Sequence, residues 1–251
     1  MKKRIIPVVL YDGTTVVKGA QFKNDRTIGA VEAIANLYAK RRPDEILFLD
    51  VKASQENRPP NFVIFEFFAS KFDIPFVVGG GIKTVEDAKK CVANGAEKVV
   101  LGSGVHSNPR LIEDTASQLG SQAVIVSLDH WGDEDFVYSH SGNVRSDKTV
   151  IEFAKQIEQL GAGELLCQDI SRDGKMSGLN IARLKEIVQL TSIPVIASGG
   201  VGKPEHFLEA FDSGVSGVAA GSMFQFTRFT PNYVAEYLKK AGISVRVSLP
   251  C

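Results

Sequence analysis

Short apolar runs alternate with stretches of helical periodicity along the whole chain. The runs are rich in Val and Ile, which is typical of strands buried on both faces. The stretches between them place apolar side chains every three or four residues, as a helix with one buried face does. Eight strands are predicted, at residues 4–10, 45–51, 76–78, 98–101, 123–128, 164–168, 194–197 and 217–220. The helices predicted to follow them lie at residues 30–41, 62–68, 84–94, 108–119, 149–160, 180–190, 204–212 and 231–240.

This alternation predicts an α/β fold, and in a chain of 251 residues it predicts a single (β/α)8 TIM barrel. Two segments fall outside the pattern. Residues 11–25 are rich in Thr, Gly and Lys and are predicted to form a loop. Residues 136–144 combine two short runs with a glycine between them, which predicts a small hairpin. Thr84 and Asp87 have the spacing of a capping box at a helix start.

The chain also repeats itself at an offset of 119 residues, the difference between 193 and 74. Residues 74–81 read IPFVVGGG and residues 193–200 read IPVIASGG, and the match needs no gap. We therefore expect one barrel built from two similar half-barrels, residues 1–120 and 121–251, since either half alone would leave open sheet edges. One pair departs from the match, because Leu10 stands opposite Asp129.

Each copy of the repeat has two glycine sites at predicted strand ends. Glycine lets the backbone approach a ligand closely, and free peptide N–H groups at such ends bind anions. Each copy therefore predicts a phosphate-binding cradle, and turn formation alone is the alternative. The candidate residues are Gly80, Gly81, Gly102 and Ser103 in the first copy and Gly199, Gly200, Gly221 and Ser222 in the second.

Composition narrows the classes of partner and cofactor. The 29 basic and 29 acidic residues balance, so nucleic acid and an acidic membrane surface are not expected as partners. The three cysteines, Cys91, Cys167 and Cys251, are odd in number and far apart, which favours a reducing compartment and no structural zinc. No metal-ligand cluster or dinucleotide fingerprint is present in the sequence, so no metal and no cofactor are expected. The apolar run near the N-terminus is too short for a signal peptide, and the cytoplasm is the expected location.

Motifs spread over nearly the whole chain are those of one known family. They are RIIP at residues 4–7, VVKG at 16–19, DEILFLD at 44–50, VGGGI at 78–82, GAGE at 161–164, RDG at 172–174, PVIASGG at 194–200 and PEHF at 204–207. On these motifs the chain resembles the HisF family, the cyclase subunits of imidazole glycerol phosphate synthase. The resemblance implies that a class I glutaminase of HisH type docks at the strand starts and makes ammonia. The ammonia would pass along the barrel axis to the strand ends, where a bisphosphorylated ribulosyl carboxamide ribotide is cleaved and cyclised.

The resemblance also assigns roles to particular residues. The ring of charges at the ammonia entrance falls on Arg4, Glu45, Lys98 and Glu164. A structural plug of salt bridges would use the same four residues, and the sequence alone does not separate plug from gate. Further residues implied to bind the phosphorylated ligand are Lys18, Asp50, Asp173 and Gly174. Lys18 lies in the predicted loop, where a merely solvated lysine is the alternative.

The family's chemistry uses two aspartates, at the ends of strands one and five. Asp129 fits the strand-five position, whereas Leu10 occupies the strand-one position and cannot transfer a proton. Asp12 would need a gap in the repeat to reach that place, and Asp173 is a better substitute. Two smaller departures are Ser171, where the family usually has Asp, and Gly102, where it has Asn. His130 beside Asp129 could be a proton shuttle, but it has no triad or metal spacing with the other histidines.

These departures favour a barrel that relays ammonia from the glutaminase while its own cyclase activity is weak or absent. Barrels similar to this one serve the amidation of an N-acetyl sugar to an acetamidino sugar in surface polysaccharides of the O-antigen type, with a sugar amidotransferase as a further partner. The first alternative is a genuine cyclase subunit of histidine biosynthesis. The second is a single-chain isomerase of the related ribotide, which would leave the charged ring unexplained.

Overall fold

Eight parallel strands close into a barrel in the computed structural model, which describes residues 2–71 and 74–246. The closure comes from the pairing of β10 with β7, and antiparallel strands extend the same sheet at two places. In chain order the barrel strands are β1 (Arg4–Tyr11), β4 (Ile46–Asp50), β5 (Phe76–Gly79), β6 (Lys98–Leu101), β7 (Val124–His130), β10 (Glu164–Asp169), β11 (Val195–Ser198) and β12 (Gly217–Ala220). The predicted (β/α)8 fold is confirmed. Cys251 lies outside the described residues.

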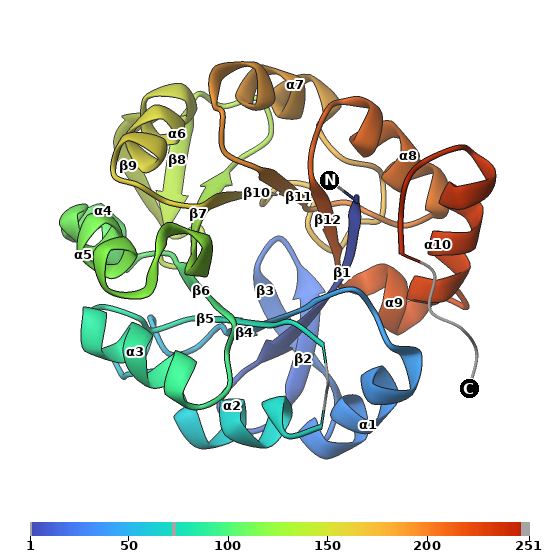
Figure 1. Ribbon diagram of the computed structural model, residues 1–251, viewed down its shortest axis with the longest axis horizontal. Coiled ribbons are helices and arrows are strands. Elements are labelled where there is room, and N and C mark those ends of the chain that lie inside the picture. Colours follow the sequence, from blue (N-terminus) through green and yellow to red (C-terminus); the bar gives the residue numbers. More distant parts are fainter. Residues whose placement is uncertain (1, 72–73, 247–251) are drawn as a thin grey trace.

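Helices surround the strands on the outside of the barrel (Figure 1). They are α1 (Val31–Arg41), α2 (Phe62–Ala69), α3 (Val85–Ala93), α5 (Arg110–Leu119), α6 (Val150–Gln159), α7 (Ile181–Leu190), α8 (Pro204–Asp212) and α10 (Pro231–Lys240). Short helical turns are added at α4 (Gly104–Ser107), η1 (Ser121–Ala123) and α9 (Ser222–Phe226). The capping box at Thr84 is confirmed, since its hydroxyl accepts from the Asp87 N–H while the Asp87 carboxylate accepts from the Thr84 N–H. Within residues 2–71 and 74–246, no helix has the length and apolar character needed to cross a membrane.

The loop predicted at residues 11–25 is wrong, because this segment forms most of a hairpin, β2 (Val16–Ala20) and β3 (Lys23–Gly29). β2 pairs antiparallel with the end of β1, matching Val17 to Leu10, and so buries its two valines. β3 reads KNDRTIG and has no apolar alternation, so its sequence gives no strand signal. The second predicted hairpin is confirmed as β8 (Phe136–Ser139) and β9 (Val144–Thr149).

Apolar side chains fill two separate regions. The larger lies between the barrel and its helices, where Phe65 and Phe68 of α2 pack on Phe48 of β4 with ring centroids 5.7 and 4.7 Å apart. The smaller lies inside the barrel and holds Ile6, Val8, Leu10, Val17, Leu47, Val77, Val100, Ile125, Leu166, Ile196 and Ala219. Because side chains alternate along a strand, every second residue of β1 points inward, and Leu10 is the last of these.

Candidate functional site

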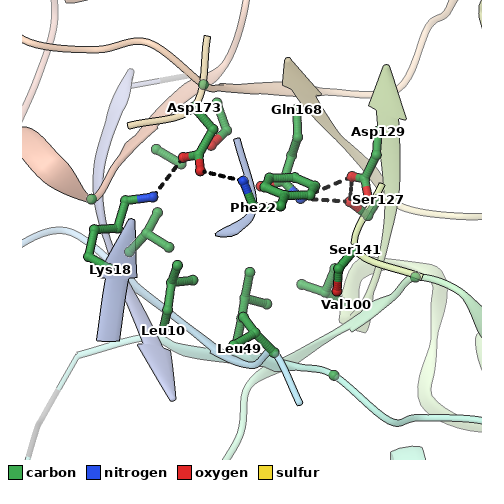
Figure 2. A pocket seen from close by; sticks show the side chains of 18 of the residues that line it. Leu10, Lys18, Phe22, Leu49, Val100, Ser127, Asp129, Ser141, Gln168 and Asp173 are labelled. Carbon is green, nitrogen blue, oxygen red and sulfur yellow. Dashed lines mark hydrogen bonds and ion pairs between the residues drawn. The ribbon is translucent and has the colours of Figure 1, made fainter. Parts of the chain in front are cut away.

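A cavity of roughly 1100 Å³, part of it open to solvent, lies at the carboxyl ends of the barrel strands (Figure 2). This is the end at which (β/α)8 enzymes place their reacting groups. Every residue predicted for the strand-end site lines it: Asp129, Lys18, Asp50, Gly80, Gly81, Gly102, Ser103, Asp173, Gly174, Gly199, Gly200, Gly221 and Ser222. Residues from both predicted half-barrels therefore face one space.

The first glycine cradle follows β5 and β6. Gly80 has φ +98°, and a Cβ there would lie 2.0 Å from the carbonyl oxygen of Asp50, so only glycine fits. Gly102 is different, because a Cβ at this position would meet nothing within 4 Å. The Ser103 hydroxyl accepts a hydrogen bond of 2.9 Å from the His140 N–H in the β8–β9 turn. This contact ties the hairpin to the first cradle.

The second cradle follows β11 and β12. Gly199 has φ +95°, and a Cβ there would lie 2.4 Å from the carbonyl oxygen of Asp169. Ser222 begins α9 and is only 4% exposed, yet its Oγ has no hydrogen-bond partner in the protein. A buried hydroxyl without a partner is unfavourable unless a ligand or water supplies one. The second cradle thus holds a polar group free to contact a ligand.

Lys18 belongs to β2 and not to a loop, and it is 3% exposed, so the solvated alternative is wrong. Its Nζ lies 2.7 Å from Oδ1 of Asp173 (Figure 2). Its aliphatic stem runs beside the second cradle, because a Cβ at Gly221 would lie 3.2 Å from Cε of Lys18. A buried cation therefore stands next to the backbone of Gly221.

The turn of the β2–β3 hairpin reaches across to the RDG segment. The Gln21 N–H donates to the carbonyl oxygen of Asp173 at 3.0 Å, and the Phe22 N–H donates to its carboxylate at 3.3 Å. Phe22 also lines the cavity (Figure 2). Both turn residues have positive φ, 54° and 61°, without being glycine. These contacts hold the hairpin over the cavity.

Asp129 accepts two hydrogen bonds at the same oxygen. Ser127 Oγ donates to Oδ1 at 2.6 Å, and Gln168 Nε2 donates to Oδ1 at 3.0 Å. Burial raises the pKa of Asp129 to about 6, although both hydrogen bonds act in the opposite direction. Within the described part of the chain, no Lys, Arg or His forms an ion pair with this carboxylate. Asp129 can therefore hold or release a proton near neutral pH.

The other two carboxylates of the cavity are neutralised. Asp50 is paired with Arg58, whose two terminal nitrogens lie 2.6 and 2.8 Å from its oxygens. Asp173 is paired with Lys18. Sequence reasoning missed Arg58, Ser127 and Gln168. The offset of 119 residues could have found the last two, since they stand opposite Val8 and Leu49 just as Asp129 stands opposite Leu10.

Leu10 lines the same cavity as Asp129 and is 7% exposed. Asp12 does not take its place, because its carboxylate accepts from the Thr14 and Thr15 N–H groups in the β1–β2 turn, at 2.9 and 2.8 Å. His130 is buried outside the cavity lining, with Nδ1 3.0 Å from the carbonyl oxygen of Gly132, and has no access as a shuttle. The strand-one position is therefore filled by an apolar side chain.

At the opposite end of the barrel, Arg4, Glu45, Lys98 and Glu164 form a closed ring of ion pairs. Arg4 lies 2.9 Å from Glu45 and 3.1 Å from Glu164, and Lys98 lies 3.0 Å from Glu164 and 3.9 Å from Glu45. Burial raises the pKa of Glu45. Burial alone would lower the pKa of Arg4, but the two glutamates outweigh it and raise it. The apolar residues inside the barrel separate this ring from the cavity.

Cys91 and Cys167 are buried and unpaired. Over residues 2–71 and 74–246, no group of three His, Cys, Asp or Glu side chains is arranged to hold a metal ion.

Comparison with known proteins matches residues 4–230 to the family model described as histidine biosynthesis protein. The chain is 39% identical over 250 residues to the imidazole glycerol phosphate synthase subunit HisF of Thermococcus onnurineus, covering 99% of both chains. It is 40% identical over 248 residues to HisF of Exiguobacterium sibiricum, covering 98% of this chain and all of the relative. HisF of Pyrococcus furiosus is 39% identical over 249 residues, with 98% and 99% covered.

Proposed function

The chain belongs to the HisF family, and on that premise we propose that it is the barrel subunit of a glutamine amidotransferase complex whose own cyclase activity is weak or absent. A class I glutaminase of HisH type docks at the charged ring and releases ammonia into the barrel. The ammonia then serves the amidation of a sugar to an acetamidino sugar by a further enzyme. A phosphorylated ligand occupies the cavity at the strand ends.

One observation carries this proposal: the cavity holds a single carboxylate without a cation, Asp129, and Leu10 fills the strand-one position. General acid and general base catalysis on one substrate needs two titratable groups within hydrogen-bond reach. Asp50 and Asp173 are held as ion pairs and are poor substitutes. Losing one such group lowers a rate by a factor of about 100 to 10,000.

The relay of ammonia is supported by the ring and by the apolar interior above it. Two acids and two bases cancel in charge, so a shift of one pair can open the ring without leaving a net buried charge. Uncharged ammonia crosses an apolar interior more readily than ammonium does, because a charge is costly to desolvate. A purely structural plug would leave glutaminase coupling unchanged when the ring is altered.

The deciding experiment measures turnover of the purified chain with an ammonium salt and the bisphosphorylated ribotide. We expect no cyclised product from the wild-type chain, and product from Leu10→Asp. Leu10→Asn is the matched control, because it has the size and polarity of Asp but cannot transfer a proton. Wild-type turnover at a useful rate would contradict the proposal.

The relay itself is tested separately, by co-purifying the chain with a class I glutaminase and following amide nitrogen from labelled glutamine. We expect the label to leave the complex as ammonia available to a sugar amidotransferase. Absence of any association with a glutaminase would exclude the relay.

A genuine cyclase subunit remains the second candidate. It is supported by two glycine cradles facing one cavity and by the unpartnered Ser222 Oγ, which suit a ligand with two phosphates. In that case Asp173 would have to leave Lys18 and act as the missing acid. The single-chain isomerase remains a weaker candidate, since it needs no charged ring.

We further propose that residues 1–120 and 121–251 are equivalent half-barrels. The support is the matched strand register: Leu10 pairs with Leu49 between β1 and β4 as Asp129 pairs with Gln168 between β7 and β10.

A further inference from the structure

The cavity has two chemically different walls (Figure 2). Leu10, Leu49 and Val100 form one wall, which we call the apolar wall, at the ends of β1, β4 and β6. Ser127, Asp129 and Gln168 form the other, the polar wall, at the ends of β7 and β10. The polar wall is joined internally, because Gln168 Nε2 donates to Ser127 Oγ and to Asp129 Oδ1, both at 3.0 Å.

The walls differ at corresponding positions of the two halves. Val8, Leu10 and Leu49 stand 119 residues before Ser127, Asp129 and Gln168. The strand registers agree, as shown by the pairs Leu10 with Leu49 and Asp129 with Gln168. The first half therefore has an apolar side chain at each position where the second half contributes to the hydrogen-bonded group. A ligand placed between the walls meets hydrogen-bonding groups on one side only.

The apolar wall also has room beside it. Gly102 directly follows the strand that carries Val100, and a Cβ at Gly102 would meet nothing within 4 Å. The anion-holding features lie elsewhere, since the unpartnered Ser222 Oγ and the stem of Lys18 adjoin the second cradle. The space thus combines a polar anchor, a polar wall and an unobstructed apolar wall.

We propose that the cavity selects a phosphate ester of a ring or chain that has an apolar face, and discriminates against phosphates of polyhydroxylated sugars. The phosphate lies at the second cradle, the apolar face lies on Leu10 and Leu49, and a hydrogen-bonding edge faces Asp129 and Gln168. This rests on the proposed function in one respect, that the cavity binds a phosphorylated ligand.

The physical reason is the difference between the two kinds of surface. Burying an apolar face against Leu10, Leu49 and Val100 removes apolar area from water and favours binding. A hydroxyl placed against the same side chains would lose its water and gain no partner, which opposes binding. The competing explanation is that the apolar wall only continues the interior through which ammonia passes, and then it would not affect ligand choice.

The test measures binding of two probes by calorimetry, phenyl phosphate and D-ribose 5-phosphate, to the full chain. We expect phenyl phosphate to bind at least tenfold more tightly. Leu10→Asn should reduce this preference at least fivefold, while Ser222→Ala should weaken both probes by a similar factor. Val63→Asn is the matched control, because Val63 is 75% exposed outside the cavity and should change neither affinity.

Circular dichroism and a melting curve establish that each variant is folded before binding is compared. Equal affinities for the two probes, or tighter binding of ribose 5-phosphate, would overturn the inference and favour the ammonia interior as the sole role of the apolar wall. No binding of either probe would overturn both the inference and the phosphate cradles. Neither result would affect the ammonia relay, which is read from the glutaminase experiment.

Discussion

Lys18 on β2 and Asp173 after β10 are 155 residues apart in the chain, and they meet at 2.7 Å beside the cavity. The pair joins the β2–β3 hairpin to the segment that follows β10. Lys18 is 3% exposed, so the interaction is shielded from water, and removing one partner leaves the other charge poorly compensated.

Lys18→Met is therefore expected to release the hairpin from the cavity. The free energy of unfolding should fall by about 3 kcal/mol, the lower end of the range for breaking a buried ion pair. Hydrogen exchange of the Gln21 and Phe22 amides, which both donate to Asp173, should become faster. Lys23→Met on the same hairpin is the control, since Lys23 is exposed. Unchanged protection of both amides in Lys18→Met would show that the ion pair does not hold the hairpin.

The two kinds of glycine in the cradles should respond differently to substitution. Gly199→Ala introduces a Cβ 2.4 Å from a backbone oxygen at φ +95°, so it should lower stability by more than about 1 kcal/mol and weaken phosphate binding. Gly102→Ala meets open space and should stay within about 0.5 kcal/mol of the wild type. Urea unfolding of the two variants measures the difference. Similar stabilities would contradict the geometry of the second cradle.

Asp129 should make folding sensitive to pH. Its pKa rises on folding from an ordinary 3.8 to about 6, so between these values the folded state binds more protons than the unfolded state. The wild type should therefore lose stability as pH rises from about 4 to about 6. Asp129→Asn removes this loss, and its stability relative to the wild type should rise over that window by at most about 3 kcal/mol, at 1.36 kcal/mol per pKa unit.

Urea unfolding of both proteins across this pH range is the measurement. Parallel pH profiles for the wild type and Asp129→Asn would show that the carboxylate is not strained by burial. Ser127→Ala should raise the pKa of Asp129 further, because it removes a hydrogen bond to the charged form.

The charged ring should be stabilising only while it is complete. Glu45→Gln leaves Arg4 and Lys98 with Glu164 as the one remaining acid of the ring, and we expect it to cost about 3 kcal/mol of unfolding free energy. Glu186→Gln, in an exposed pair with Arg183, is the control and should cost less than about 1 kcal/mol. In a complex with a glutaminase, Glu45→Gln should also reduce transfer of ammonia into the barrel. Normal transfer with reduced stability would favour a structural plug.

The alternation of apolar runs with helical stretches was sufficient to predict the barrel, and the glycine repeats were sufficient to predict which residues share one cavity. Both follow from a general constraint: parallel strands joined by helices bring all their carboxyl ends to one face, whatever the side chains between them. The same constraint brought Arg4, Glu45, Lys98 and Glu164 together at the opposite end. Leu10 could be assigned to the strand-one position because the repeat fixes its register.

The tertiary structure alone decided which partners the polar groups have. Lys18 could not be distinguished from a solvated lysine, because its partner lies 155 residues away and its strand becomes visible only by pairing with β1. Arg58 neutralises Asp50 from a loop without a regular pattern, and the bonds from Ser127 and Gln168 to Asp129 depend on two strands in register. Local periodicity encodes which face of an element is buried, whereas the protonation of Asp129 and the pairing of its neighbours depend on distances between elements that only folding sets.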